Sequence, residues 1–407
     1  MTARLVADPS VFQPLFPEER VLGELLDRAS RLIASAHRLT GQASLAVRAS
    51  LATPLRAMNS YYTNKIEGQH TLPADIERAI RREFDADREL QRKQRLALAH
   101  MDAEHALEQA VEGGDPPALF DPERIRAIHF NLYSRLPESD RLTEDGEPTV
   151  PGAWRTKRVT AGRHLAPPSE DIPELMAFWA RRYRELRGNE QLVIGIACAH
   201  HRLTWVHPFI DGNGRAARLH SHLLMHALGL SGGLWSPMRG LARTRETYYA
   251  RRNNADLPRR NDLDGRGPLS QEELVAFARY FLDVCLDQVA FMDNMLALDR
   301  FRERLADMLR HLEAKPWQIG TERSVIKPEV LPALHYVAIT GAMERTRFLA
   351  TTGLPMRTAR RVLASLLDYG LLRSDTRLGP VSFNIPFKSL RWLFPRLWPE
   401  ADESLPA

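Results

Sequence analysis

The sequence has little of what marks a secreted or membrane-embedded protein. It holds only two cysteines, Cys198 and Cys285, and both stand in apolar helical contexts. Two buried thiols without a disulfide framework are typical of a reduced compartment. No apolar run approaches the roughly 18 residues of a membrane-spanning helix, and the first residues lack the apolar stretch of a signal peptide. We therefore expect a cytoplasmic protein without a membrane partner.

Internal repeats, low-complexity tracts and long charged runs are also lacking. Apolar residues make up 44% of the 407 positions, which is enough for a large core. At this length we expect a large domain and at least one appended domain. The net charge of +5 is unevenly spread, because residues 341–398 hold ten Arg and Lys against three acids, an excess of +7. Such a segment favours a nucleic-acid partner, although an arginine-rich solvated surface explains it equally well.

Most of the first 315 residues shows the three- and four-residue apolar spacing of amphipathic helices. Residues 150–168 break this pattern with prolines and glycines and are expected to form a β-hairpin or flap. The last helical run begins with a capping-box arrangement from Ser270 to Glu273. The expected helices lie at about 22–36, 48–67, 72–112, 121–134, 170–186, 190–205 and 270–312.

A different pattern follows residues 315–328, whose two prolines and one glycine mark the expected linker. It predicts two helices, the second over 356–369, and then two short strands around 378–380. This order resembles a winged helix-turn-helix, in which the second helix enters the major groove of duplex DNA. The outward face of that helix would carry Arg357, Arg360 and Arg361. The alternative is a packing or dimerisation domain, so duplex DNA and a second copy of the chain are both candidate partners.

The stretch "HPFIDGNGRAAR", residues 207–218, stands directly before an apolar helical pattern. Gly212 and Gly214 permit backbone torsions that aim successive N–H groups into one phosphate-binding nest. The helix N-terminus that follows adds unpaired donors and the positive end of its dipole. Arg215 and Arg218 lie three residues apart and can make forked contacts to phosphate oxygens. The glycines, the helix start and the arginines together predict a site for a di- or triphosphate.

Two further residues of this stretch suit transfer chemistry. Asp211 offers a hard oxygen ligand for Mg²⁺ bridging two phosphates. His207 titrates near neutrality and can take a proton from an attacking hydroxyl. A base, a metal-binding carboxylate and a phosphate nest together indicate phosphoryl or nucleotidyl transfer. A Gly-Asn-Gly sequence alone would indicate only a turn.

The same stretch resembles the Fic family motif, His-x-Phe-x-Asp/Glu-Gly-Asn-Gly-Arg-x-x-Arg, at every fixed position. Most Fic proteins transfer AMP from ATP to a hydroxyl of a protein side chain. The resemblance therefore implies ATP and Mg²⁺ as cofactors, and a target protein whose identity the sequence leaves open. It implies that His207 is the general base and that Asp211 binds Mg²⁺. It also implies phosphate contacts, with the γ-phosphate at Arg218 and the α- and β-phosphates at Gly212, Asn213, Gly214 and Arg215.

The resemblance extends over about residues 20–295. Tyr248 and Tyr249 match a tyrosine pair that lines the nucleobase pocket in the family. The family's hairpin flap aligns target backbone by strand addition. We count its equivalents among the nucleotide-binding residues: Val159, Thr160, Ala161 and Gly162.

Residues 63–68, "TNKIEG", resemble the family's inhibitory motif, Ser/Thr-x-x-x-Glu-Gly. The physical reasoning is independent of the resemblance. A helix ends naturally at Gly68 and leaves Glu67 near its tip, able to pair with an arginine otherwise meant for phosphate. Without the catalytic motif, Glu67 would be interpreted as one more exposed acid near a helix end.

Several histidines outside the motif raise the question of a second metal site. His222 and His226 have the i, i+4 spacing of helical zinc ligands, but the acid of an HExxH pattern is missing. We therefore predict a structural role for them and for the remaining members of the group, His200, His201 and His220.

The predicted fold is mainly α, a Fic-type helical core with a small β-hairpin flap and a C-terminal winged helix-turn-helix. The predicted domains are a helical region with the inhibitory motif (1–110), a catalytic core (111–314) and a winged-helix-like DNA-binding module (328–398). The predicted function is that of a protein adenylyltransferase, autoinhibited by Glu67. Two alternatives remain. One is a winged-helix transcription regulator with a nucleotide-sensing core, and the other is a Fic enzyme that removes AMP or uses another nucleotide donor.

Overall fold

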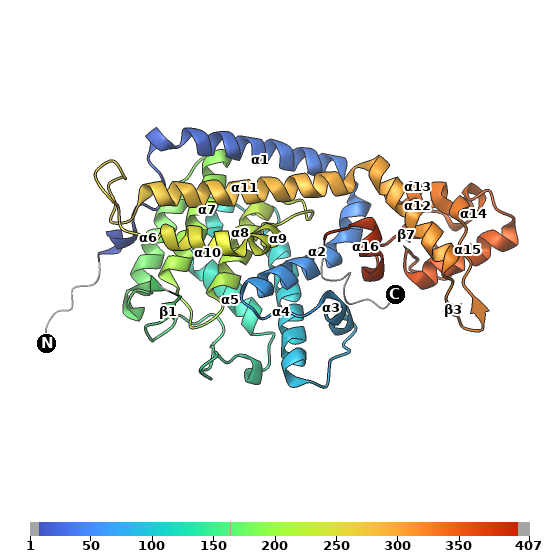
Figure 1. Ribbon diagram of the computed structural model, residues 1–407, viewed down its shortest axis with the longest axis horizontal. Coiled ribbons are helices and arrows are strands. Elements are labelled where there is room, and N and C mark those ends of the chain that lie inside the picture. Colours follow the sequence, from blue (N-terminus) through green and yellow to red (C-terminus); the bar gives the residue numbers. More distant parts are fainter. Residues whose placement is uncertain (1–7, 163, 398–407) are drawn as a thin grey trace. The chain divides into compact units, whose positions relative to one another are not determined.

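The computed structural model describes residues 8–162 and 164–397 (Figure 1). Residues 1–7 and 398 of the predicted domains lie outside the described residues, as does the side chain of Ala161. The chain divides into two compact units. The first comprises residues up to 37 together with 59–71 and 78–289, and the second comprises 38–58, 72–77 and the residues from 290 onward.

The first unit is a helical bundle centred on α8 (Figure 1). Helix α8 packs against α4, α5 and α7, and α7 packs in turn against α6. A buried ring cluster of Phe120, Trp179 and Tyr183 fills the space beside α6. Its helices are α4 (Arg88–Val111), α5 (Pro122–Tyr133), α6 (Ile172–Arg184), α7 (Asn189–Val206), α8 (Asn213–Ala227), α9 (Met238–Arg243) and α10 (Arg245–Asn254).

A small hairpin within the first unit confirms the flap predicted for residues 150–168. Strands β1 (Thr160–Ala161) and β2 (His164–Leu165) are antiparallel and pair Thr160 with Leu165. Four helices contribute residues to both units: α1 (Gly23–Gln42), α2 (Leu45–Ile66), α3 (Pro73–Ile80) and α11 (Gln271–Leu296). Short 3-10 helices occur at Pro9–Phe12, Glu19–Val21, Pro116–Leu119, Glu138–Asp140, Ser169–Asp171, Pro328–Val330 and Phe387–Ser389.

The second unit combines helices with a three-stranded antiparallel sheet. The sheet has the order β5 (Ala342–Met343), β7 (Val381–Phe383), β6 (Leu372–Arg373). A separate hairpin, β3 (Gln318–Ile319) and β4 (Glu322–Arg323), lies within the expected linker. The helices are α12 (Leu298–Ala314), α13 (Leu331–Thr340), α14 (Arg345–Thr351), α15 (Met356–Tyr369) and α16 (Leu390–Leu393). Helices α14 and α15 followed by the β6–β7 pair agree with the expected order, and the winged-helix classification stays a prediction.

Two expected helices are each divided. The run predicted over 72–112 is wrong as a single helix, because α3 ends at Ile80 and α4 begins at Arg88. Between them Arg82 has a φ of 64°, a left-handed conformation that no helix continues through. The run over 270–312 divides at Ala297, whose ψ of 118° leaves the helical region. Its predicted start is confirmed, since Ser270 Oγ accepts a hydrogen bond from the Glu273 amide at 3.1 Å.

Within the described ranges, no helix has both the length and the apolar character needed to cross a bilayer.

Candidate active site

The loop between α7 and α8 begins with His207. Helix α7 ends at Val206, and His207 follows in the left-handed region with φ 52° and ψ 58°. Its Nδ1 lies 3.3 Å from the carbonyl oxygen of Thr204. Since a carbonyl only accepts, Nδ1 carries the proton and Nε2 keeps its lone pair. Burial lowers the pKa of His207 to about 4, against the opposing effect of the Thr204 carbonyl. The imidazole is therefore neutral near pH 7 and can accept a proton at Nε2.

The turn that follows is closed by Asn213. Its Oδ1 accepts from the Phe209 amide at 2.9 Å, and its Nδ2 donates to the Phe209 carbonyl at 2.8 Å. Gly212 has a φ of 77°, and a Cβ there would lie 2.5 Å from the Tyr133 ring. Both the torsion and the space therefore require glycine at this position. The turn leads into the first turn of α8, where Gly212 is the N-cap and has no side chain to cap the helix.

Asp211 is held by two partners from within the first unit. Its Oδ2 accepts from the Tyr133 hydroxyl at 2.6 Å and from Arg215 Nη2 at 2.9 Å. The same Arg215 nitrogen donates to the Tyr133 hydroxyl at 2.7 Å, which closes a triangle. Burial alone would raise the pKa of Asp211, but Arg215 and Tyr133 outweigh it and the pKa lies below its usual value. Asp211 is therefore an oriented carboxylate at the mouth of the loop, suited to a hard cation.

The tip of α2 reaches the start of α8. Gly68 has a φ of 74° and ends the helix, as the sequence predicted. Glu67 Oε1 accepts from Arg218 Nη2 at 2.5 Å, and Thr63 Oγ1 accepts from Arg218 Nε at 2.7 Å. A Cβ added to Gly214 would overlap Glu67 Oε1, so the carboxylate lies directly over the glycine turn. Burial disfavours the charge on Glu67, yet Arg218 outweighs it and lowers the pKa of the carboxyl below its ordinary value.

Two side chains of α10 fix the same tip. Arg245 Nε donates to the Ile66 carbonyl at 2.8 Å, and the Tyr249 hydroxyl donates to it at 3.1 Å. These bonds satisfy one of the carbonyls that a helix leaves unpaired at its C-terminal end. Glu67 directly follows Ile66, whose carbonyl is fixed by these two bonds. The position of Glu67 over Gly214 is therefore also set by the contacts of its neighbour.

A cavity of about 460 Å³ unites most of the predicted site residues. Its lining comprises Glu67, Gly162, His207, Ile210, Asp211, Gly212, Asn213, Gly214, Arg215, Tyr249, Arg252 and Asn253. Val159 and Thr160 line an adjoining cavity of about 570 Å³ that shares Glu67, Asp211 and Arg215. Tyr248 does not line either cavity, because it is fully buried and its hydroxyl bonds His200 Nε2 at 2.8 Å.

The segment that holds this loop is similar in sequence to a known protein family. Residues 119–225, which include the loop and α5, match the model of the Fic/DOC family. This segment is therefore similar to the Fic domain of that family. Over 126 residues it is 29% identical to the protein adenylyltransferase Fic of Drosophila mojavensis, and over 130 residues 33% identical to that of Drosophila erecta. Both alignments cover 31% of this chain and 24% of the relative, so the chain spans about a quarter of the length of these curated relatives.

The fold of a solved structure is also similar. A Fic domain containing signaling protein from Bacteroides thetaiotaomicron superposes with a TM-score of 0.50 at 14% identity. The match covers 65% of this chain and 95% of that one. At this identity the likeness concerns the fold alone.

The matched segment also holds three residues near the loop that the sequence did not single out. Tyr133 and His129 lie one turn apart on α5, and His129 stacks on Phe209 with ring centroids 3.8 Å apart. Arg155 is buried, donates to the His207 carbonyl at 2.7 Å and to the Pro167 carbonyl at 2.6 Å. It thereby ties the loop of residues 207–218 to the end of the flap. The sequence offered no signal that singles out Arg155, because Arg158 and Arg163 stand in the same segment predicted as a hairpin.

Three of the other histidines considered above, all in the first unit, have hydrogen-bonding partners within that unit. His200 lies 2.9 Å from Ser221 Oγ, and His220 Nε2 lies 3.0 Å from the Leu119 carbonyl. His226 contacts Ser231 Oγ at 3.2 Å. His222 differs, because its neighbours are two buried carboxylates of α4.

Proposed function

We propose that this protein transfers AMP from ATP to a hydroxyl group of a protein side chain, and that Glu67 restrains the reaction. The observation that carries the proposal is the single cavity shared by His207, Asp211 and the glycine turn. A protein that only senses a nucleotide needs the turn and the arginines. It does not need a neutral histidine beside them whose basic nitrogen is set by a bond to the Thr204 carbonyl.

Each residue of the cavity has a part in the proposed step. The acceptor hydroxyl oxygen attacks the α-phosphorus of ATP, and its proton passes to His207 Nε2. The bond between the α-phosphorus and the oxygen bridging to the β-phosphate breaks, and pyrophosphate leaves. The backbone donors of Gly212 to Gly214 and the guanidinium of Arg215 stabilise the charge on the phosphates. Mg²⁺ bound at Asp211 would neutralise two phosphates, and the oriented carboxylate described above fits that ion.

The proposed restraint acts on the γ-phosphate. Arg218 is the second arginine of the nest, and its Nη2 is already bound by Glu67. The charged carboxylate also lies over Gly214, where a phosphate would meet repulsion as well as a missing partner. A nucleotide that avoids this position cannot place its α-phosphorus in line with the acceptor. Glu67 would thus lower the rate of transfer more than the binding of the nucleotide.

The experiment uses the full chain with Glu67→Gly, which frees the nest. After incubation with a lysate and Mg²⁺, label from α-labelled ATP should appear on protein, while label from γ-labelled ATP should not. The γ-label leaves with pyrophosphate, so this pair separates AMP transfer from phosphorylation. α-Labelled GTP, CTP and UTP test other nucleotide donors, and loss of label from premodified targets tests AMP removal. Absence of α-label on any protein, at several nucleotide donors, would contradict the proposal.

A second function, binding of duplex DNA by the C-terminal module, is favoured by the exposure of three arginines on α15. Arg357, Arg360 and Arg361 are exposed, while Ala359, Leu363 and Leu366 of the same helix are buried. The basic side chains therefore occupy the outward face of the second helix of the α14–α15 pair. Three phosphate contacts would make the affinity fall steeply as salt rises, with a slope of roughly three decades per decade of salt.

The DNA proposal is tested by measuring the affinity of the full chain for a fluorescent duplex at about 50 mM and about 200 mM salt. Replacing Arg357, Arg360 and Arg361 together by alanine should weaken binding and flatten the salt dependence. The matched control replaces three exposed arginines of the first unit, Arg124, Arg181 and Arg184. Equal DNA affinity of the two triple variants, or no DNA binding by the parent chain, would contradict the proposal. The C-terminal module would then be interpreted as a packing or dimerisation domain.

A further inference from the structure

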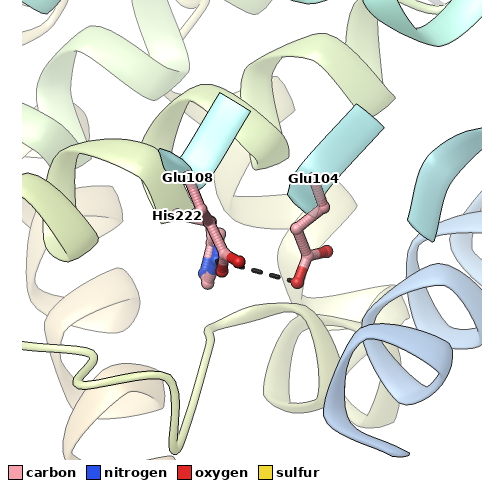
Figure 2. A group of neighbouring side chains, drawn as sticks. All are labelled: Glu104, Glu108 and His222. Atoms are coloured by element: carbon pink, nitrogen blue, oxygen red, sulfur yellow. Dashed lines mark hydrogen bonds and ion pairs between the residues drawn. The ribbon is translucent and has the colours of Figure 1, made fainter. Parts of the chain in front are cut away.

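Three acid-base side chains meet in the interior of the first unit, away from the cavity described above. Helix α4 carries Glu104 and Glu108 one turn apart, and α8 carries His222 opposite them (Figure 2). His222 Nε2 lies 2.8 Å from Glu108 Oε1 and 3.7 Å from Glu104 Oε1. One ligand atom from each residue falls within 4.8 Å of the other two. Figure 2 shows the two carboxylates and the imidazole converging between the two helices.

Burial makes this group costly unless something compensates its charge. Glu104 is 1% exposed, Glu108 7% and His222 2%. Moving a charged carboxylate from water into the protein interior is destabilising, and two adjacent carboxylates also repel each other. Buried acids therefore persist where a cation or a proton lies between them. A divalent ion and a protonated His222 are the two candidates for that charge.

A fourth side chain points to the ion. His100 precedes Glu104 by one helical turn, is 1% exposed, and places Nδ1 3.6 Å from Glu104 Oε2. Among the residues that the structure describes, neither ring nitrogen of His100 has a hydrogen-bond partner. A buried imidazole left in that state is destabilising and calls for a group that the protein chain alone does not supply.

The spacing of the donor atoms also suits a small divalent ion. Four donors at about 2.05 Å from a tetrahedral zinc lie about 3.3 Å from one another. The separations of His222 Nε2 from Glu108 Oε1, 2.8 Å, and from Glu104 Oε1, 3.7 Å, fall on both sides of that value. Asn59 Nδ2 donates to Glu104 Oε1 at 2.7 Å and orients it, as outer partners of metal-binding carboxylates do.

We propose that Glu104, Glu108 and His222 bind one divalent ion of the zinc class, with His100 beside Glu104 as a further donor at the edge of the site. Imidazole and carboxylate together suit Zn²⁺ better than Mg²⁺ or Ca²⁺, which prefer oxygen donors and retain water. The enclosure of the group by α4 and α8 indicates a structural ion. His222 follows Arg218 by one helical turn, so the ion would also fix the helix that carries the nest arginines.

This inference is independent of the proposed AMP transfer, because none of its residues lines the 460 Å³ cavity. It extends the structural role predicted for His222, whose partners come from α4 and not from a pattern within α8. The sequence could not show this, since 114 positions separate Glu108 from His222.

The test measures metal in the full chain after removal with a chelator and reloading with Zn²⁺. The expected result is one zinc per chain by elemental analysis, and a rise in melting temperature on reloading. Co²⁺ in place of Zn²⁺ should give the visible absorption bands of a four-coordinate site. A parent chain that binds no stoichiometric zinc, and gives no such Co²⁺ bands, overturns the proposal whatever the variants do.

The variants locate the ion. Glu108→Gln and His222→Gln should each weaken zinc binding at least about tenfold, and His100→Gln by about ten- to a hundredfold. The matched control is His226→Gln, the next histidine on the same helix, which should leave the stoichiometry unchanged. Asp211→Asn, at the separate candidate Mg²⁺ ligand, should also leave it unchanged. Zinc binding that survives Glu108→Gln and His222→Gln, or that disappears with His226→Gln, would overturn the assignment.

Discussion

The loop of residues 207–218 and the tip of α2 meet at one helix N-terminus, yet they are built in opposite ways. The loop organises itself: Asp211 binds Arg215 four residues later, and Asn213 closes the turn on Phe209. The tip of α2 comes from 151 residues away to place Glu67 on Arg218. Arg215 therefore pairs with an acid from its own loop, whereas Arg218 pairs with an acid from a distant helix.

The two ion pairs should differ in what their loss does to the site. The Asp211–Arg215 pair belongs to the loop and is shared with Tyr133, so breaking it would disturb the site itself. The Glu67–Arg218 pair joins two segments, and Arg218 keeps a second partner in Thr63 when Glu67 is lost. Removing a loop residue should therefore abolish transfer, whereas removing a residue of the α2 tip should increase it.

The largest effect is expected at His207. In the Glu67→Gly background, His207→Ala should lower AMP transfer by about 10²–10⁴-fold, because the base acts on the proton of the attacking hydroxyl. ATP binding should stay within a few-fold, since a base contributes to the transition state and not to ground-state binding. Single-turnover labelling and ATP titration measure the two quantities. Transfer within tenfold of the parent would show that His207 is not the base.

The conformation of the loop of residues 207–218 could be predicted from the sequence because its residues are contiguous. Spacing alone places Gly212, Asn213 and Gly214 at a turn before a helix, and the structure has them there. The helical fold was predictable for the same reason, since apolar spacing is a local property. The breaks at Arg82 and Ala297 were missed because neither the segment 81–87 nor Ala297 offers a glycine or proline as a signal.

Residues whose role depends on packing could not be found in this way. Tyr133 and His129 matter because α5 lies against the loop, and nothing in their own spacing indicates that. Tyr248 shows the reverse case, because the family resemblance placed it in the nucleobase pocket and the structure buries it against His200. The carboxylates of α4 became visible as a group with His222 only when the helices were packed.

A smaller effect is expected at Thr63, and in the direction opposite to that at His207. Thr63→Ala removes the hydroxyl that accepts from Arg218 Nε and should loosen the hold of α2 on the arginine. One such hydrogen bond contributes about 1 kcal/mol, so transfer should rise roughly fivefold. Thr63→Ser retains the hydroxyl and should behave as the parent chain. A decrease in transfer with Thr63→Ala would place Thr63 in the active site and not in the restraint.

The smallest effect concerns pH, and it depends on the burial of His207. Burial lowers the pKa of His207 to about 4, so the basic, neutral form persists well below pH 6.5 and is lost only as the pH falls toward 4. In the Glu67→Gly chain, kcat/KM for AMP transfer should therefore change little between about pH 5.5 and 8. Circular dichroism over the same range controls for unfolding. A decline with a midpoint near 6.5 would indicate an exposed histidine as the base.

If Glu67 withholds Arg218 from the nucleotide, the rates of AMP transfer by three forms of the chain will differ in a set order. The rate of labelled-AMP incorporation is measured at saturating ATP for the parent chain, Glu67→Gly, and Glu67→Gly with Arg218→Ala. One charged hydrogen bond contributes about 1.5–3 kcal/mol, so Glu67→Gly should raise the rate roughly ten- to a hundredfold. Arg218→Ala should cancel much of that gain, because the freed arginine is the proposed partner of the γ-phosphate. Equal rates for the parent chain and Glu67→Gly would contradict the account.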